Sequence, residues 1–241
     1  MPENPASEHT SLLRTVAVIP AAGTGLRMGT EQAKQFLDLD GRPLLAVTLD
    51  IFQSSPVIHE IVLVVPPQEV DHCRRRIVDR FELGKVRKVV AGGKRRQDSV
   101  RRGIEACGNG FEWVVIHDGV RPLVRPELID RIVAAVRESR AVISALPAKE
   151  TVKDVDNSHL VRGTYDRRRV WLVQTPQAFR YEDILAAHRL AAEEGWDEVT
   201  DDALLMERMG ISVRVIEGME DNIKVTTPHD LELARFLLKR R

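Results

Sequence analysis

Cysteine, aromatic residues and long apolar stretches are all scarce in this sequence of 241 residues. The two cysteines, Cys73 and Cys107, lie far apart and have no metal-ligand spacing, so a disulfide framework is excluded and a reducing compartment is expected. Aromatic residues make up 5% of the chain, and no motif of a nucleic-acid reader accompanies them. The apolar runs are too short to cross a bilayer. We therefore expect a cytoplasmic protein that binds neither membrane nor nucleic acid.

Net charge is also absent, because 36 basic residues balance 36 acidic ones. No overall field therefore draws the protein towards nucleic acid or an anionic membrane. The basic residues nevertheless cluster at 74–76, 94–102 and 167–169. Such local clusters in a neutral chain are compatible with a small polyanionic ligand, although residues 74–76 are better explained as a solvated helix face.

Residues 1–14 contain two prolines and no apolar stretch, and we expect a flexible tail there that is neither a secretory signal nor a transit peptide. Residues 15–241 contain no internal repeat or domain-sized linker. Their length suits a single α/β domain.

Short apolar runs alternate regularly with amphipathic segments. Runs of four to six residues, rich in β-branched side chains, begin at 16, 61, 86, 113 and 141 and are typical of strands buried on both faces. Helical spacing follows at 43–52, 70–81, 126–136, 181–194 and 201–209, and a strand over 213–217 precedes a last helix with Thr227 as its N-cap. The alternation predicts an α/β fold: a Rossmann-like, doubly wound, mostly parallel sheet.

The alternation breaks after Pro147. Residues 151–155 alternate polar and apolar side chains, 156–158 are turn-forming, and 160–161 can return as a second strand. We interpret residues from about 148 to 170 as an inserted β-hairpin arm. An isolated hairpin is only marginally stable in water, so the arm is expected to pack on something else, with a second copy of the chain as the natural candidate.

Small residues follow the first predicted strand. Glycine and alanine at the carboxyl end of a parallel strand let backbone N–H groups approach a polyanion, and Arg27 and Lys34 add positive charge. The spacing matches neither the P-loop nor the dinucleotide fingerprint. Two glycines alone would favour an ordinary turn, but the longer string with Lys34 and Gln35 predicts a phosphate cradle made of Pro20, Ala21, Ala22, Gly23 and Gly25.

The string 20–28 with Lys34 and Gln35 resembles the nucleotide-binding loop of the sugar nucleotidyltransferases. Further motifs at 92–100, 117–122, 174–177, 200–201 and 221–226 follow in family order, so that nearly the whole chain is similar to the 2-C-methyl-D-erythritol 4-phosphate cytidylyltransferases of non-mevalonate isoprenoid synthesis. The resemblance implies transfer of CMP from CTP to 2-C-methyl-D-erythritol 4-phosphate, which gives 4-diphosphocytidyl-2-C-methyl-D-erythritol and pyrophosphate. A cytidylyltransferase for another polyol phosphate, such as ribitol 5-phosphate, is the alternative.

The resemblance also implies a role for individual residues. Arg27, Lys34 and Lys224 would stabilise charge in the reaction, and the alternation around Lys224 predicts a short strand at 222–225. Asp118 would hold Mg²⁺ against the triphosphate, as hard oxygen ligands do. Besides the cradle, CTP would contact Gly92, Gly93, Arg96, Ser99 and Asp118, and the acceptor would contact Arg121, Thr151, Arg167, Thr175 and Thr200.

In the resembled family the arm swaps across a homodimer, so that an arginine matching Arg167, with Arg168 and Arg169 beside it, grips the substrate phosphate in the partner's site. The residues alone leave simpler roles open for several positions: Ser99 as a helix cap, Asp118 as a turn cap, and turns or caps for Thr175 and Thr200. The sequence departs from the family at 119–120, where Gly-Val stands for Ala-Ala, and at Lys94, where an acidic or small polar residue is expected.

Overall fold

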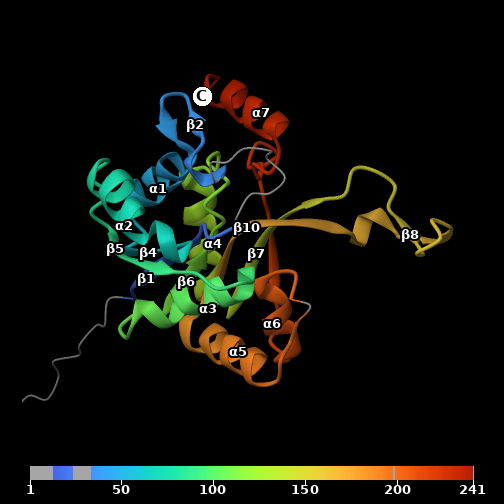
Figure 1. Ribbon diagram of the computed structural model, residues 1–241. Helices are drawn as coiled ribbons and strands as arrows, with labels where there is room; N and C mark the ends of the chain where they lie inside the picture. The colour runs from blue at the N-terminus through green and yellow to red at the C-terminus, as the bar shows by residue number, and fades with distance from the viewer. Residues whose placement is uncertain (1–12, 24–33, 198, 241) are drawn as a thin grey trace, which may run out of the picture.

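A seven-stranded sheet forms the centre of the computed structural model, which describes residues 13–23, 34–197 and 199–240, with side chains from Gln35 onward in the second range. The strand order is β11-β7-β10-β6-β1-β4-β5 (Figure 1). All neighbours run parallel except β10, which is antiparallel to both β6 and β7. The predicted mostly parallel α/β sheet is confirmed. Its strands are β1 (Thr15–Pro20), β4 (Glu60–Val65), β5 (Val86–Ala91), β6 (Trp113–Ile116), β7 (Ala141–Pro147), β10 (Trp171–Arg180) and β11 (Arg214–Glu217).

Helices cover both faces of the sheet (Figure 1). One face carries α1 (Leu44–Ser54), α2 (Val70–Cys73), which continues as a π-helical turn (Arg74–Asp79), and α4 (Pro126–Glu138). The other carries α3 (Arg96–Cys107), α5 (Tyr181–Glu193) and α6 (Asp202–Arg208). The last helix, α7 (Pro228–Leu238), packs beside a short hairpin of β2 (Asp38–Leu39) and β3 (Arg42–Pro43). Single 3₁₀ turns lie at Lys34–Phe36, Pro67–Glu69 and Arg167–Arg169.

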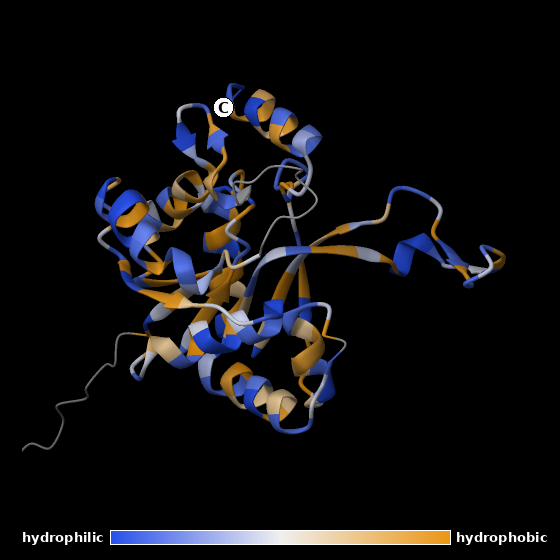
Figure 2. Ribbon diagram, viewed as in Figure 1, coloured by the Kyte–Doolittle hydropathy of each residue, from blue (hydrophilic) through white to orange (hydrophobic). Residues whose placement is uncertain are grey.

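The core explains why these segments fold as they do. Every residue of β1 and β6 is buried, and orange apolar colour follows the central strands in Figure 2. The helices add their apolar stripes, such as Leu49 and Phe52 of α1 on one face and Val100 and Ile104 of α3 on the other, all fully buried. Burying each such side chain contributes roughly 2 kcal/mol to the stability of the folded state. The carboxyl ends of β1, β4 and β6 are thereby fixed at one edge of the sheet.

The segment after β7 leaves the body as an arm (Figure 1). Its tip is an antiparallel hairpin of β8 (Lys153–Val155) and β9 (Val161–Thr164), which confirms the predicted hairpin. The arm exposes large apolar side chains, including Leu160 (61%), Val161 (59%) and Leu172 (58%). A single chain therefore leaves apolar surface of the arm in water.

Two of the differences from the sequence predictions concern segments that reach the site. Strand β10 was not predicted, because its polar residues and Pro176 interrupt the apolar pattern; a register shift between Val173 and Gln177 accommodates the proline inside the sheet. The short strand predicted at 222–225 was wrong. That segment is irregular, because its polar groups bond to β10 and to the loop after β6 instead of to a neighbouring strand.

Candidate active site

A cavity lies at the carboxyl ends of β1 and β6. Its walls come from the loop after β1, the start of α3, the end of β6 and the segment before α7. Nine residues predicted for the site line it, together with Gln35, Lys94, Arg95 and Val120, which had no assigned role. The nine are Pro20, Ala21, Ala22, Gly23, Gly93, Arg96, Ser99, Asp118 and Lys224.

Gly92 and Gly93 allow the α3 loop to approach the β1 loop closely. A Cβ on Gly92 would lie 2.4 Å from the Ala22 Cβ and 2.8 Å from Ser99 Oγ, so only glycine fits there. The Gly93 N–H donates to Ser99 Oγ (3.0 Å), and this hydroxyl donates to the Arg95 carbonyl (3.2 Å). The N-cap of α3 is Arg95, so the alternative reading of Ser99 as the helix cap was wrong. Ser99 instead shapes the wall of the cavity.

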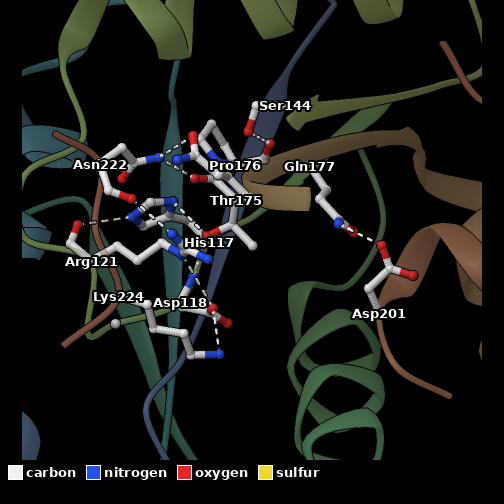
Figure 3. A network of polar contacts seen from close by, with 12 residues as sticks. His117, Asp118, Arg121, Ser144, Thr175, Pro176, Gln177, Asp201, Asn222 and Lys224 are labelled. Carbon is white, nitrogen blue, oxygen red and sulfur yellow. Dashed lines mark hydrogen bonds and ion pairs between the residues drawn. The ribbon is translucent and has the colours of Figure 1, made fainter. Parts of the chain in front are cut away.

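Three cations surround the carboxylate of Asp118 (Figure 3 shows Arg121 and Lys224 beside it). Lys224 Nζ lies 2.9 Å from Oδ2, Arg96 Nε lies 3.3 Å from Oδ1, and Arg121 Nε lies 3.5 Å from Oδ2. Burial raises the pKa of Asp118, but Arg96, Lys224 and Arg121 outweigh burial and hold it well below its ordinary value. Asp118 is therefore ionised at neutral pH, and positive charge exceeds negative charge around it.

His117 is linked through Thr175 to the backbone of Asp118. Burial lowers the pKa of His117 to about 4, so its ring is neutral at pH 7. Its Nε2 lies 3.2 Å from the Arg121 carbonyl, an acceptor, which assigns the ring proton to Nε2. Nδ1 then accepts from the Thr175 hydroxyl (3.1 Å), whose oxygen accepts from the Asp118 backbone N–H (3.1 Å). His117 is structural, and Thr175, on strand β10, is part of the same network and not of a turn.

Asn222 fixes the irregular segment that carries Lys224. Its Nδ2 donates to the Thr175 carbonyl (2.7 Å), and its own carbonyl accepts from Arg121 Nη1 (2.8 Å). On the other side of the segment, the Val225 N–H donates a hydrogen bond to the Val120 carbonyl (2.9 Å). Lys224 is thus directed at Asp118 from a segment without regular structure. Sequence patterning failed here because the constraint is side-chain bonding and not strand pairing.

A second cavity opens beside the first and shares three residues with it: Arg96, Asp118 and Lys224. Ile143, Val173, Gln174, Leu204 and Glu207 also line it. Three predicted acceptor residues, Arg121, Thr175 and Thr200, lie here, joined by Gln177 and Asp201, which had no assigned role. Gln177 Nε2 donates to Asp201 Oδ2 (2.9 Å; Figure 3). We call these three shared residues the seam, because they form the boundary between the two cavities.

Some predicted residues lie elsewhere. Thr151 and Arg167 are on the exposed arm and line neither cavity; Arg167 Nη1 donates to the Lys149 carbonyl (3.0 Å). Gly92 stands behind the wall of the first cavity. Gly25 and Arg27 lie outside the described residues, and so does the side chain of Lys34.

Asp118 is the carboxylate shared by both cavities, and it could hold a metal that a bound triphosphate also contacts. Within the described ranges there is no cluster of three or more His, Cys, Asp or Glu that could hold a metal ion. Mg²⁺ commonly uses only one or two carboxylates and takes further oxygens from substrate phosphates. An ionised, cavity-lining Asp118 suits that arrangement, with the rest of the coordination shell supplied by a bound triphosphate and water.

Cations gathered around Asp118 at the carboxyl edge of a doubly wound sheet, beside two joined cavities, are the arrangement expected of a nucleotidyltransferase. A model of the family "2-C-methyl-D-erythritol 4-phosphate cytidylyltransferase" matches residues 15–240. The chain belongs to this family. Among the described residues no helix is long and apolar enough to cross a membrane.

Relatives and solved structures agree with this placement. The chain is 46% identical over 229 residues to the 2-C-methyl-D-erythritol 4-phosphate cytidylyltransferase of Geotalea uraniireducens, with 94% of this chain and 97% of the relative covered. It is 45% identical over 228 residues to the protein of the same description in Geobacter metallireducens (93% and 97% covered). The crystal structure of 4-diphosphocytidyl-2C-methyl-D-erythritol synthase from Anaerococcus prevotii is similar with a TM-score of 0.81 at 35% identity (94% and 96% covered).

Proposed function

We propose that this enzyme transfers CMP from CTP to 2-C-methyl-D-erythritol 4-phosphate and releases pyrophosphate. The observation that carries the proposal is the seam. Two adjacent cavities share a carboxylate and two cations, Asp118, Arg96 and Lys224, and a group passing between two bound substrates has to react at that boundary. The names of the family and of the curated relatives supply the identities of donor and acceptor.

The proposed reaction requires stabilisation of negative charge and correct positioning of the two substrates. The nucleophile is an oxygen of a phosphate monoester, which is already ionised near neutral pH, so no general base is needed. This oxygen attacks the α-phosphorus of CTP in line, a P–O bond forms, and the bond to pyrophosphate breaks. The described site agrees with this, since its ionisable groups at the seam are paired charges and the nearby His117 is buried and neutral. Catalysis then comes from oriented reactants and preorganised charge.

Each part of the site has a role in this scheme. The first cavity, with the small residues after β1 and the Gly92-Gly93 turn, holds CTP. Arg96 and Lys224, with Arg27 and Lys34 from the sequence that follows β1, neutralise phosphate charge. Asp118 would hold Mg²⁺, which when bound draws electron density from the phosphates. The second cavity receives the acceptor, whose phosphate faces Arg121 and whose hydroxyls face Thr175 and Thr200.

We further propose that the enzyme acts as a cytoplasmic homodimer in which the arm crosses to the partner. Exposed apolar side chains on the arm support this, because soluble proteins rarely leave so extended an apolar element uncovered. Thr151 and Arg167, which line neither cavity of their own chain, would then complete the partner's second cavity.

Pyrophosphate release tests the proposal. Purified enzyme with Mg²⁺ is given each of the four nucleoside triphosphates together with 2-C-methyl-D-erythritol 4-phosphate or ribitol 5-phosphate. Turnover confined to CTP and the methylerythritol phosphate is the expected result. Preference for ribitol 5-phosphate would show that the proposed acceptor is wrong. Turnover with another nucleoside triphosphate would show that CTP is not the specific donor.

A further inference from the structure

The seam residue Arg96 is held from two sides. It is the first residue of α3, and its guanidinium stands between two carboxylates. Nε lies 3.3 Å from Asp118 Oδ1, and Nη1 lies 2.8 Å from Asp202 Oδ2. The Asp118 side chain opens into both cavities, whereas that of Asp202 is 1% exposed and lines neither. Asp202 therefore contacts Arg96 without lining either cavity.

A second buried residue holds Asp202 in turn. His188 on α5 places Nε2 3.2 Å from Asp202 Oδ1, without hydrogen-bond geometry, and its side chain is also 1% exposed. Asp202 is the first residue of α6, and α5 and α6 pack together against the same face of the sheet as α3. His188, Asp202, Arg96 and Asp118 thus form one chain of contacts from the interior of the helical layer to the seam.

Burying a carboxylate costs free energy unless the carboxylate is well paired. The buried position of Asp202 therefore calls for a functional explanation. Asp118 already has Lys224 and Arg121 as partners, and Arg96 would be free to fold fully onto it or to turn into solvent. Asp202 pairs with one branch of the guanidinium through charge, without hydrogen-bond geometry, and the arginine side chain remains 30% exposed and lines both cavities. A planar, forked cation held in this way has one orientation before substrate arrives.

We propose that Asp202, backed by His188, is a positioning residue that holds Arg96 in the orientation needed for phosphate transfer at the seam. The proposal rests on the function proposed above. It assigns neither residue to substrate contact; both act through Arg96. Since a displacement of about 1 Å in a positioning group can cost about a hundredfold in rate, loss of Asp202 is expected to lower turnover by about ten- to a hundredfold.

The test compares Asp202→Asn, Arg96→Gln and the double variant, with turnover followed by pyrophosphate release and CTP affinity measured by calorimetry. Asp202→Asn is expected to lower kcat more than it raises the KM for CTP. Because Asp202 acts through Arg96, the double variant is expected to be no slower than Arg96→Gln alone. Additive losses, or normal turnover of Asp202→Asn, overturn the proposal.

The matched control is Asp183→Asn, an equivalent change on α5. Asp183 also pairs with an arginine, Arg140, but lines neither cavity. Normal turnover of this control is expected. A loss equal to that of Asp202→Asn would show that the effect is nonspecific and would overturn the proposal. Should Asp202→Asn fail to fold, His188→Leu takes its place, with a smaller loss of kcat expected and full turnover contradicting the role of His188.

Wild-type enzyme separates the two proposals. If it releases no pyrophosphate with any acceptor, the proposed function fails. The positioning of Arg96 is then still measured through CTP affinity, which Asp202→Asn must weaken and must not weaken further when Arg96 is already glutamine. Additive or absent effects on affinity would overturn the positioning role independently.

Discussion

The ammonium group of Lys224 lies 2.9 Å from the carboxylate of Asp118, and each residue lines both cavities of the site. The lysine comes from an irregular segment before α7 and the aspartate from the end of β6. In the proposed reaction this pair would place a cation beside the phosphorus that gains negative charge in the transition state. The predictions below start from this relationship.

Replacing Lys224 by methionine removes that cation while keeping an unbranched side chain. We expect kcat to fall by about a hundredfold or more, because one preorganised charge typically contributes about 3 kcal/mol to transition-state stabilisation. The fold should persist, since Arg96 and Arg121 still pair with Asp118. Lys88→Met, which removes an exposed lysine bonded only to the Ala106 carbonyl among the described residues, serves as the control with normal turnover. Near-normal kcat for Lys224→Met would show that Lys224 does not stabilise the transition state.

Substituting Gly92 by alanine tests the close approach of the two loops. A Cβ would sit 2.4 Å from the Ala22 Cβ, so either the phosphate cradle or the α3 loop must move. We expect CTP affinity, measured by calorimetry, to fall by about tenfold or more. Gly84→Ala is the control, because a Cβ there meets nothing within 4 Å. Equal affinities for the two variants would show that the cradle tolerates displacement.

His117 gives the stability of the protein a dependence on pH. Burial lowers the pKa of His117 to about 4 in the folded chain, against 6.5 when unfolded. Above pH 6.5 neither state is protonated and stability is unaffected; as pH falls below 6.5 the unfolded state alone takes up the proton, so stability is lost. Between pH 7.5 and 5 the loss attributable to His117 is about 2 kcal/mol.

The measurement is urea unfolding of metal-free protein at both pH values, for wild type and for His117→Gln. The variant keeps a polar side chain but cannot titrate, so its stability is expected to fall by about 2 kcal/mol less than that of wild type over this interval. The same pH dependence in both proteins would contradict a neutral His117.

Chelation distinguishes a metal brought by substrate from one built into the fold. EDTA is expected to stop pyrophosphate release, and added Mg²⁺ to restore it. The free energy of unfolding without nucleotide should be unchanged by EDTA, because the described residues hold no cluster of metal ligands. Full turnover in EDTA would remove the metal from the proposed function.

Subunit mixing tests the arm. If Arg167 acts in the partner's site, Arg167→Ala and Lys224→Ala chains, each inactive alone, form mixed dimers with one intact site. Random assembly of equal amounts then recovers about a quarter of wild-type turnover. If Arg167 acts in its own site, the mixture stays inactive, and the proposed exchange of arms is wrong.

The architecture could be read from the sequence because it rests on local patterns. The apolar runs at β1, β4, β6 and β7 and the capping of α7 by Thr227 are each encoded within a few residues, and the structure confirms them. Strand β10 was missed because Pro176 and its polar neighbours are stabilised by partners distant in the chain.

The site was predicted unevenly for the same reason. Small residues after β1 and the carboxylate after β6 sit at strand ends, where position follows from topology. By contrast, the roles of Asn222 and Asp202 depend on pairing across several elements, Asn222 with Thr175 and Asp202 with Arg96 and His188. No spacing in the sequence reports such contacts.

The irregular segment that carries Lys224 has a consequence for synthesis of the protein. It is anchored by Asn222 on one side and, through Thr226 and Thr227, by the capping of α7 on the other. During translation the strands and helices that enclose both cavities emerge before this segment does. Lys224 has the highest number among the described residues that line the two cavities, so it is the last of them to be synthesised.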